Sequence, residues 1–180
     1  MEQAGFEASE RFEALFDRYH GDVAAYVRRR APARLAEDVV GETFLIAWRS
    51  RDRVHGDPLP WLYGVARRVL ANDLRREYRR GALAARLAQE RDESATTGLG
   101  DAVSEPVRSA LLALGQHERE AVLLIAWEGL NPKQAAAAAG CSGPTFRARL
   151  YRARRHLRRA LNSRTLAEEP RAVAKEAGGA

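Results

Sequence analysis

The chain has 180 residues, of which 46% are hydrophobic and 30% charged, so it is long enough for one compact domain or two small ones and too polar for a membrane protein. The start of the chain lacks a secretory signal pattern, and no apolar run approaches the ~20 residues that cross a bilayer, so we expect a cytoplasmic protein. Its single cysteine, Cys141, excludes an intramolecular disulfide, and the four histidines lie too far apart for a local zinc motif. We therefore expect no metal and no cofactor.

The net charge of +6 is unevenly distributed along the chain. Residues 51–80 carry +4 and residues 143–160 carry +7, whereas residues 1–50 and 81–142 are net acidic. Segment 143–160 contains seven Arg and no acidic residue. An ordinary solvated helix would mix in acidic residues, so this segment favours contact with a polyanion such as nucleic acid.

Three amphipathic helices are predicted in the first half of the chain. Apolar residues recur at spacings of three and four within residues 11–30, 35–50 and 60–80. Trp61, near the start of the third helix, is expected in the core rather than as a platform for a nucleic-acid base. The side opposite the apolar stripe of that helix collects Arg67, Arg68, Arg75, Arg76, Arg79 and Arg80. Short polar loops between these helices predict one small all-helical domain.

A second helical domain is predicted in the other half. Residues 91–104 contain Gly and small polar residues without apolar periodicity, which predicts a flexible linker, and the tail beyond about Thr165 is expected to be disordered. The helices are expected at 106–114, 117–128, 132–139 and 143–161. Cap residues mark their ends, namely Gly115, Gly129 and Gly140 at C-terminal ends and Asn131 and Ser142 at N-terminal ends. The predicted fold class is all-α, with two small helical domains joined by a flexible linker.

The last two predicted helices have the size and turn of a helix-turn-helix, in which the second helix enters the major groove of DNA. Phe146, Leu150, Ala153 and Leu157 share one face of that helix and are expected to pack inward. A hairpin that merely completes a core is the alternative, and the run of Arg argues against it. The predicted DNA-binding residues are Ser142, Pro144, Thr145, Arg147, Ala148, Arg149, Tyr151, Arg152 and Arg154.

Three sequence blocks follow one another along the chain. The first is AEDVVGETFLIAWR at 36–49, and the second is PWLYGVARRVLAN at 60–72. The third consists of the strings GQHEREAVLL, EGLNP and TFRARLYRAR between residues 115 and 154. Taken together, they resemble the sigma-70 family of bacterial RNA polymerase initiation factors: the first block is similar to region 2.2, the second to regions 2.3 and 2.4, and the third to region 4. The order of the blocks, with only a linker between regions 2 and 4, is typical of the small extracytoplasmic-function subfamily.

This resemblance implies a domain division and a function. The division is region 2 at 10–81, a linker at 82–105, region 4 at 106–162 and a tail at 163–180. The chain is expected to be a sigma factor, not an enzyme, that directs core RNA polymerase to promoters and assists their melting. An anti-sigma factor is a further expected partner.

The resemblance also implies roles for single residues. Asp38, Glu42 and Arg49 would contact the clamp helices of the largest polymerase subunit, while region 4 would meet the flap of the second-largest subunit. The recognition helix would read the minus-thirty-five element. The loop 51–59 would hold a flipped base of the minus-ten element. The remaining minus-ten contacts would come from Arg67, Arg68, Asn72, Arg75 and Arg76.

The chain departs from the family pattern at some of these positions. Gly41 stands where many members have Gln, Arg68 where Asn is frequent, and Asn72 where Asp is frequent. The start of the recognition helix, Gly143-Pro144, also differs, so promoter preference does not transfer. A two-domain helix-turn-helix regulator that is not a polymerase subunit is the alternative function, but it does not explain why an acidic helix is followed by a basic one.

Overall fold

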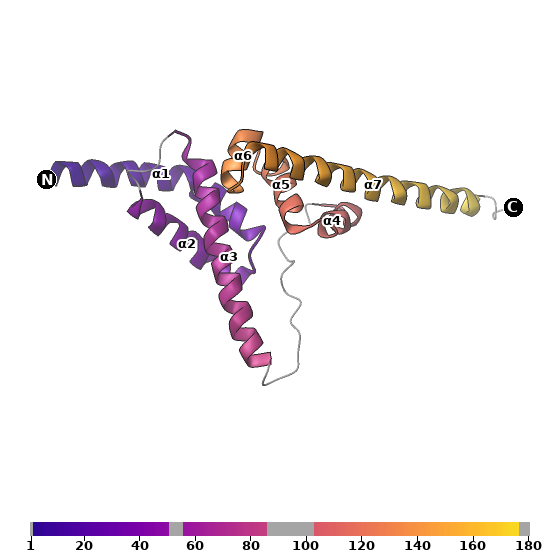
Figure 1. Ribbon diagram of the computed structural model, residues 1–180, viewed down its shortest axis with the longest axis horizontal. Coiled ribbons are helices and arrows are strands. Elements are labelled where there is room, and N and C mark those ends of the chain that lie inside the picture. Colours follow the sequence, from indigo (N-terminus) through magenta and orange to yellow (C-terminus); the bar gives the residue numbers. More distant parts are fainter. Residues whose placement is uncertain (1, 51–55, 86–102, 177–180) are drawn as a thin grey trace. The chain divides into compact units, whose positions relative to one another are not determined.

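The computed structural model describes the backbone of residues 2–50, 56–85 and 103–176, and the side chains of residues 9–50, 56–80 and 103–162. All regular structure in these ranges is α-helical, as predicted. The chain forms two compact units, one containing α1, α2 and α3, the other containing α4, α5 and α7 (Figure 1). The helices are α1 (Glu2–Arg28), α2 (Ala33–Arg49), α3 (Pro58–Ala85), α4 (Glu105–Leu112), α5 (Gln116–Ala126), α6 (Pro132–Ala138) and α7 (Gly143–Glu176).

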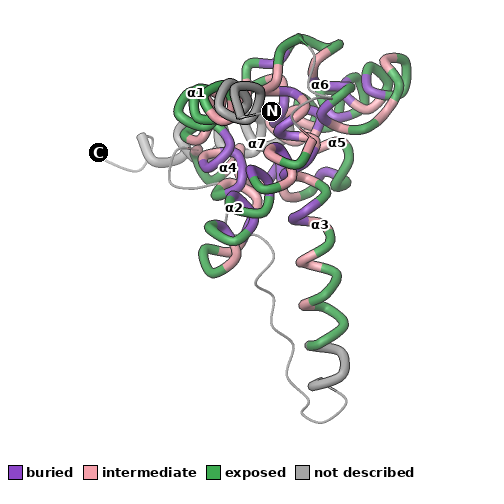
Figure 2. The backbone as a smooth tube through the Cα atoms, turned by 90° about the vertical axis from the view of Figure 1, so that its left-hand side faces the viewer, coloured by how far each residue is buried: buried purple, intermediate pink, exposed green. Residues whose placement is uncertain are grey.

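The first unit is a three-helix core in which α1, α2 and α3 each contact the other two. The buried residues largely follow the predicted apolar stripes, and Figure 2 colours the backbone by burial, with buried residues in purple. The ring of Tyr26 on α1 stacks on that of Tyr63 on α3, with 4.7 Å between centroids. The fully buried hydroxyl of Thr43 donates a hydrogen bond to the carbonyl of Val39 at 2.6 Å, so this polar group is satisfied inside the core.

Aromatic rings extend the contact between α1 and α2 beyond this core. Phe12 meets Trp48 edge to face with 5.0 Å between centroids, and Phe16 meets Phe44 in the same way at 4.8 Å. Such pairs add about 0.5–1.5 kcal/mol each beyond the area that they bury. The aromatic residues thus fix α2 against α1 and leave the opposite side of α2 open.

The second unit is built around the first half of α7, which contacts both α4 and α5. Phe146 and Ala153 of α7 are fully buried, and Leu150 is 8% exposed. Leu111 of α4 and Ala121 and Leu124 of α5 are buried as well. The predicted inward face of the last helix is therefore confirmed at these three residues of α7, whereas the fourth predicted residue, Leu157, is half-buried.

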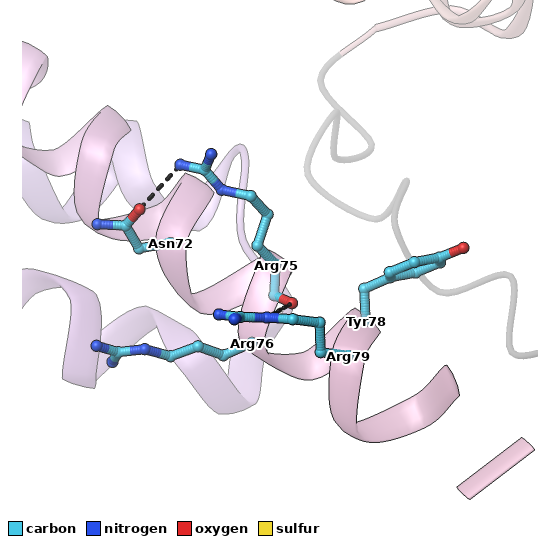
Figure 3. Close-up of a pocket in the computed structure, with 5 residues that line it drawn as sticks. All are labelled: Asn72, Arg75, Arg76, Tyr78 and Arg79. Carbon is cyan, nitrogen blue, oxygen red and sulfur yellow. Dashed lines mark hydrogen bonds between the residues drawn. The ribbon is translucent and has the colours of Figure 1, made fainter. Parts of the chain in front are cut away.

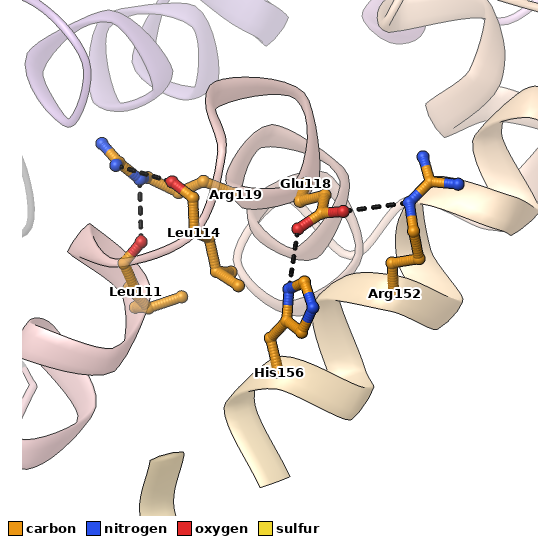
Figure 4. A network of polar contacts seen from close by, with 6 residues as sticks. All are labelled: Leu111, Leu114, Glu118, Arg119, Arg152 and His156. Atoms are coloured by element: carbon orange, nitrogen blue, oxygen red, sulfur yellow. Dashed lines mark hydrogen bonds and ion pairs between the residues drawn. The ribbon is translucent and has the colours of Figure 1, made fainter. Parts of the chain in front are cut away.

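The C-terminal end of α4 is closed by a side chain from α5. The guanidinium of Arg119 donates hydrogen bonds to the carbonyls of Leu111 at 2.9 Å and Leu114 at 3.0 Å, which Figure 4 shows. It also donates one to the carbonyl of Leu112 at 2.8 Å. The last carbonyls of a helix have no partner within the helix and need one from elsewhere. Arg119 binds two such carbonyls, those of Leu111 and Leu112, as well as the carbonyl of Leu114 in the following loop, and it joins α4 to α5.

The turns on either side of α6 follow the predicted cap pattern. Gly129 and Gly140 both have a φ of 63°, which glycine adopts without a steric cost. Asn131 accepts hydrogen bonds from the backbone of Lys133 and Gln134, and the side chain of Gln134 accepts one from the Asn131 backbone. The Ser142 hydroxyl accepts a hydrogen bond from the Thr145 backbone at 3.3 Å, which caps α7.

Helix ends differ from the predicted ones in several places. α1 begins before residue 11, α3 continues past residue 80, and α7 continues to Glu176, into the segment expected to be disordered. The added segments are rich in Ala, Glu and Arg, which favour helix without an amphipathic pattern. Gly115 was expected to cap the end of α4 but has a φ of −57° and precedes α5 as its N-cap. A left-handed glycine is not needed there, because Arg119 already binds the carbonyls.

Replacing Arg119 by Ala is predicted to destabilise the second unit by about 2–4 kcal/mol, because three partly buried carbonyls lose charged hydrogen-bond donors. Urea unfolding followed by circular dichroism measures the change. Arg158→Ala is the control, since Arg158 is exposed on α7 and surface changes usually stay within about 0.5 kcal/mol. Equal stabilities of the two variants would contradict the role assigned to Arg119.

Candidate interfaces for protein and DNA

The outward side of α2 carries the three residues predicted to bind polymerase. Asp38, Glu42 and Arg49 are exposed and, at positions i, i+4 and i+11, form one line along the helix. Leu45 lies on this line at i+7 and is 40% exposed. We call these four residues the α2 line. Leu45 was missed by sequence reasoning, although its i+7 spacing from Asp38 marked it, and it places an apolar centre within a charged rim.

Gly41 lies beside the α2 line and is exposed. A Cβ atom added to Gly41 would meet no other atom within 4 Å, so space does not require glycine there. Within a helix, glycine costs roughly 1 kcal/mol relative to alanine. Gly41 therefore lowers the intrinsic stability of α2 without being required by a close contact.

The basic residues of α3 are arranged as a stripe with two flanks. Arg68, Asn72, Arg75 and Arg79 follow one another at helical spacing and are all exposed. Arg67 lies on one side of this stripe, about 100° around the helix from Arg68. Of the predicted minus-ten residues, the structure therefore aligns Arg68, Asn72 and Arg75 and turns Arg67 away from them.

Hydrogen bonds hold this stripe in shape. Asn72 accepts a hydrogen bond from Arg75 at 2.9 Å, and Arg79 donates one to the Arg75 carbonyl at 3.3 Å (Figure 3). Arg76 lies on the other flank and pairs with Asp73 at 3.3 Å, a partly exposed contact worth little in water. Asn72 therefore orients an arginine instead of adding a charge.

A pocket on the C-terminal half of α3 includes a residue that sequence reasoning missed. Asn72, Arg75, Arg76, Tyr78 and Arg79 line this pocket, as Figure 3 shows. The side chain of Tyr78 is 78% exposed. An exposed ring among arginines is the arrangement with which proteins stack unpaired bases while binding phosphates. The part of the predicted base-holding loop at 51–55 lies outside the described residues.

The predicted recognition helix is the first part of α7, and most of its predicted residues face outward. Pro144, Thr145, Arg147, Ala148, Tyr151 and Arg154 are exposed, Arg149 is half-buried, and Ser142 precedes the helix as its cap. Arg155 lies one turn beyond Tyr151 on the same side and is also exposed. Sequence reasoning missed Arg155, although its seven-residue spacing from Ala148 marked the same face.

Arg152 differs from the other predicted DNA-binding residues because it pairs with a carboxylate of another helix. The carboxylate of Glu118, on α5, accepts a hydrogen bond from Arg152 at 3.0 Å and contacts the ring of His156 at 3.1 Å (Figure 4). Burial raises the pKa of Glu118, but the hydrogen bonds and charges of Arg152 and His156 outweigh this effect and lower the pKa below its usual value. Glu118 therefore stays ionised and neutralises part of the charge of α7.

The described side chains contain no group of three or more His, Cys, Asp or Glu residues placed to hold a metal ion. Cys141, in the turn before α7, is a free thiol. Within the described part of the chain, every helix is too short or too polar to cross a membrane.

Comparison with known proteins assigns both halves of the chain. Residues 15–80 match the family model of sigma-70 region 2, and residues 104–157 match that of sigma-70 region 4. The chain is 31% identical to the ECF RNA polymerase sigma-E factor of Escherichia coli over 157 residues, which cover 79% of this chain and 82% of that protein. It is 33% identical to the ECF RNA polymerase sigma factor EcfG of Rhodopseudomonas palustris over 129 residues, covering 68% of each.

Solved structures share the fold. The sigma factor RpoE of Bartonella quintana, solved with the anti-sigma factor NepR, superposes with a TM-score of 0.60 at 24% identity, covering 85% of this chain and 98% of that one. CnrH, solved with the cytosolic domain of CnrY, superposes with a TM-score of 0.58 at 25% identity, covering 89% and 95%.

Proposed function

Because this chain belongs to the sigma-70 family and is an RNA polymerase sigma factor of the extracytoplasmic-function type, we propose that α2, α3 and α7 each make a different contact of transcription initiation. A sigma factor directs core polymerase to specific promoters and assists their melting. The observation that carries the division of labour is that one chain presents an acidic line on α2 and separate arginine faces on α3 and α7. A regulator that is not a polymerase subunit has no use for the first of these.

Region 2 is proposed to extend over residues 10–81 and region 4 over 106–162, with 82–105 as linker and 163–180 as tail. The family matches at 15–80 and 104–157 support these limits. The chain acts by binding rather than by catalysis, and it works in the cytoplasm, where core polymerase and the chromosome are found. These statements follow from the role of a sigma factor.

The α2 line is proposed to bind the clamp helices of the largest polymerase subunit. Leu45 supplies apolar area at its centre, and Asp38, Glu42 and Arg49 supply charges around it. Interfaces typically combine an apolar centre with a polar rim, and the rim charges steer association and fix orientation. The flap of the second-largest subunit is the proposed partner of region 4.

Reversing two charges of the α2 line, in Asp38→Arg/Glu42→Arg, is predicted to weaken binding to core polymerase by at least about tenfold, because like charges across an interface cost several kcal/mol. Fluorescence anisotropy with labelled sigma factor and core polymerase measures the affinity. The matched control is Glu13→Arg/Asp17→Arg, an exposed pair on α1 with the same spacing. The proposed interface is wrong if the folded α2 variant binds as tightly as this control.

The exposed stripe of α3 is proposed to follow the melted minus-ten element. Arg68, Arg75 and Arg79 would bind successive phosphates, and Asn72 would keep Arg75 in position. Arg67 and Arg76 would contact the strand from the flanks. Tyr78 offers a ring on which an unpaired base can stack.

The start of α7 is proposed to read the minus-thirty-five element in the major groove. Thr145, Arg147 and Ala148 lie near the N-terminal end, from which a recognition helix reaches base edges. Arg154 and Arg155 lie about two turns further along, where phosphates are the nearer partners. The two sets of residues therefore contribute differently to specificity.

Arg147→Ala is predicted to weaken binding to the preferred upstream element by about 1–3 kcal/mol and to relax its sequence preference. Arg154→Ala is predicted to weaken all sequences about equally and to reduce the slope of log K against log salt by roughly 0.9. Binding of the reconstituted holoenzyme to promoter and shuffled duplexes at several salt concentrations separates the two effects. The opposite assignment, with base preference changed only in Arg154→Ala, would mean that α7 docks in another orientation.

An anti-sigma factor is proposed to cover DNA-binding faces when this sigma factor is idle. Support comes from RpoE of Bartonella quintana, a protein of the same fold that was crystallised in complex with the anti-sigma factor NepR. Affinity purification of the tagged chain from its native host is expected to recover a stoichiometric protein partner in at least one growth condition. Recovery of core polymerase alone in every condition would contradict the proposal.

A further inference from the structure

Glu118 contacts two side chains that lie one turn apart on α7. The carboxylate is 34 residues before Arg152 and 38 before His156 in the sequence, and one of its oxygens faces each of them. The side chain of Glu118 is only 16% exposed, whereas those of Arg152 and His156 are 55% and 52% exposed. A covered carboxylate thus holds two side chains that border the DNA-facing surface (Figure 4).

The pairing is unusual for α7 because this helix has no acidic residue of its own between Gly143 and Ala160. The other arginines of this segment are exposed, apart from the half-buried Arg149. Arg152 sits next to Tyr151 and one turn from Ala148, within reach of DNA if its side chain were released. Its guanidinium instead turns toward α5.

An ion pair has two possible consequences for a DNA-binding helix. It can simply hold α7 against α5. In that case, replacing either residue of the pair weakens every activity of the unit. Alternatively, it can withhold a cation from the phosphate backbone, in which case removing the acid adds a contact that was absent before. The second consequence alters the salt dependence of binding, because each new phosphate contact releases further counterions.

We propose that Glu118 is a positioning residue that withholds Arg152 from DNA phosphates and thereby raises the share of base-specific contacts in the binding energy. This inference rests on the proposed placement of α7 in the major groove. Phosphate contacts carry no sequence information, so a cation held back from them lowers binding to all DNA and leaves discrimination to residues near the start of α7. The ligand concerned is the phosphate backbone of double-stranded DNA.

The experiment uses the full chain assembled with core polymerase, and measures affinity for a promoter duplex and a shuffled duplex between about 50 and 300 mM monovalent salt. Glu118→Gln is expected to tighten binding to the shuffled duplex by up to about eightfold at 0.1 M salt and to steepen its salt slope by about 0.9, as one added phosphate contact would. The preference for the promoter duplex falls accordingly. Glu105→Gln, the same charge change at an exposed residue of α4, is the matched control.

The partner residue supplies the decisive second variant. Arg152→Gln is expected to keep the wild-type salt slope, because Arg152 does not contact DNA in the wild-type protein, and Glu118→Gln/Arg152→Gln is expected to return to that slope. A slope reduced by about 0.9 in Arg152→Gln alone would show that Arg152 already binds DNA and would overturn the proposal. An unchanged or flatter slope in Glu118→Gln would overturn it as well.

Failure of the underlying function has a different signature. If the wild-type holoenzyme showed no preference for the promoter duplex, or if Arg147→Ala left that preference intact, the placement of α7 would be wrong independently of Glu118. Thermal unfolding of each variant by circular dichroism separates loss of folding from both outcomes. A merely structural ion pair predicts lower melting temperatures without any gain in binding to the shuffled duplex.

Discussion

The burial of Phe146, Leu150 and Ala153 is the constraint on which the DNA-facing unit depends. These three side chains fix the rotation of α7 about its own axis, and this rotation decides which of its arginines face outward. The packing of these three side chains therefore affects DNA recognition indirectly. Each neighbouring feature supports the same rotation, from the cap at Ser142 to the contact that Glu118 makes from α5.

The first unit meets a similar demand with a three-helix core. Three helices bury one stripe each, so the opposite sides of α2 and α3 remain for contacts with other molecules. The charges of α2 are on balance acidic, and those of α3 are on balance basic. Arg34 of α2 and Glu77 of α3 pair across the two helices at 2.8 Å. In this way, a single small domain can bind a protein with one face and a nucleic acid with another.

The sequence predicted the features that depend on local periodicity and missed those that depend on long-range contact. The inward faces of α2 and α7 and the caps at Asn131 and Ser142 follow from spacing and residue type, and the structure confirms them. The role of Arg119 could not be read in this way, because its partners lie in another helix. The misassignment of Gly115 has the same cause, since a distant guanidinium replaced the local cap.

Arg152 shows the same limit within the site itself. Periodicity placed Arg152 outside the core but could not reveal a carboxylate 34 residues earlier in the chain. Leu45 is a different case, because its i+7 spacing from Asp38 already placed it on the outward face, although it follows the buried Phe44 in an apolar string. Sequence periodicity indicates whether a side chain faces away from the core. Whether that side chain can bind a ligand also depends on its contacts with the other helices of the unit.

The residue type of the α7 cations has a consequence for covalent regulation. Seven Arg and no Lys occupy residues 143–160, and the two lysines of the chain are Lys133 and Lys175. Acetylation removes the charge of lysine, whereas methylation of arginine leaves the charge in place. The enzymes that silence many basic DNA-binding surfaces by acetylating lysine therefore find no target along the recognition helix. Its positive charge can be offset only by carboxylates or other anions brought against it.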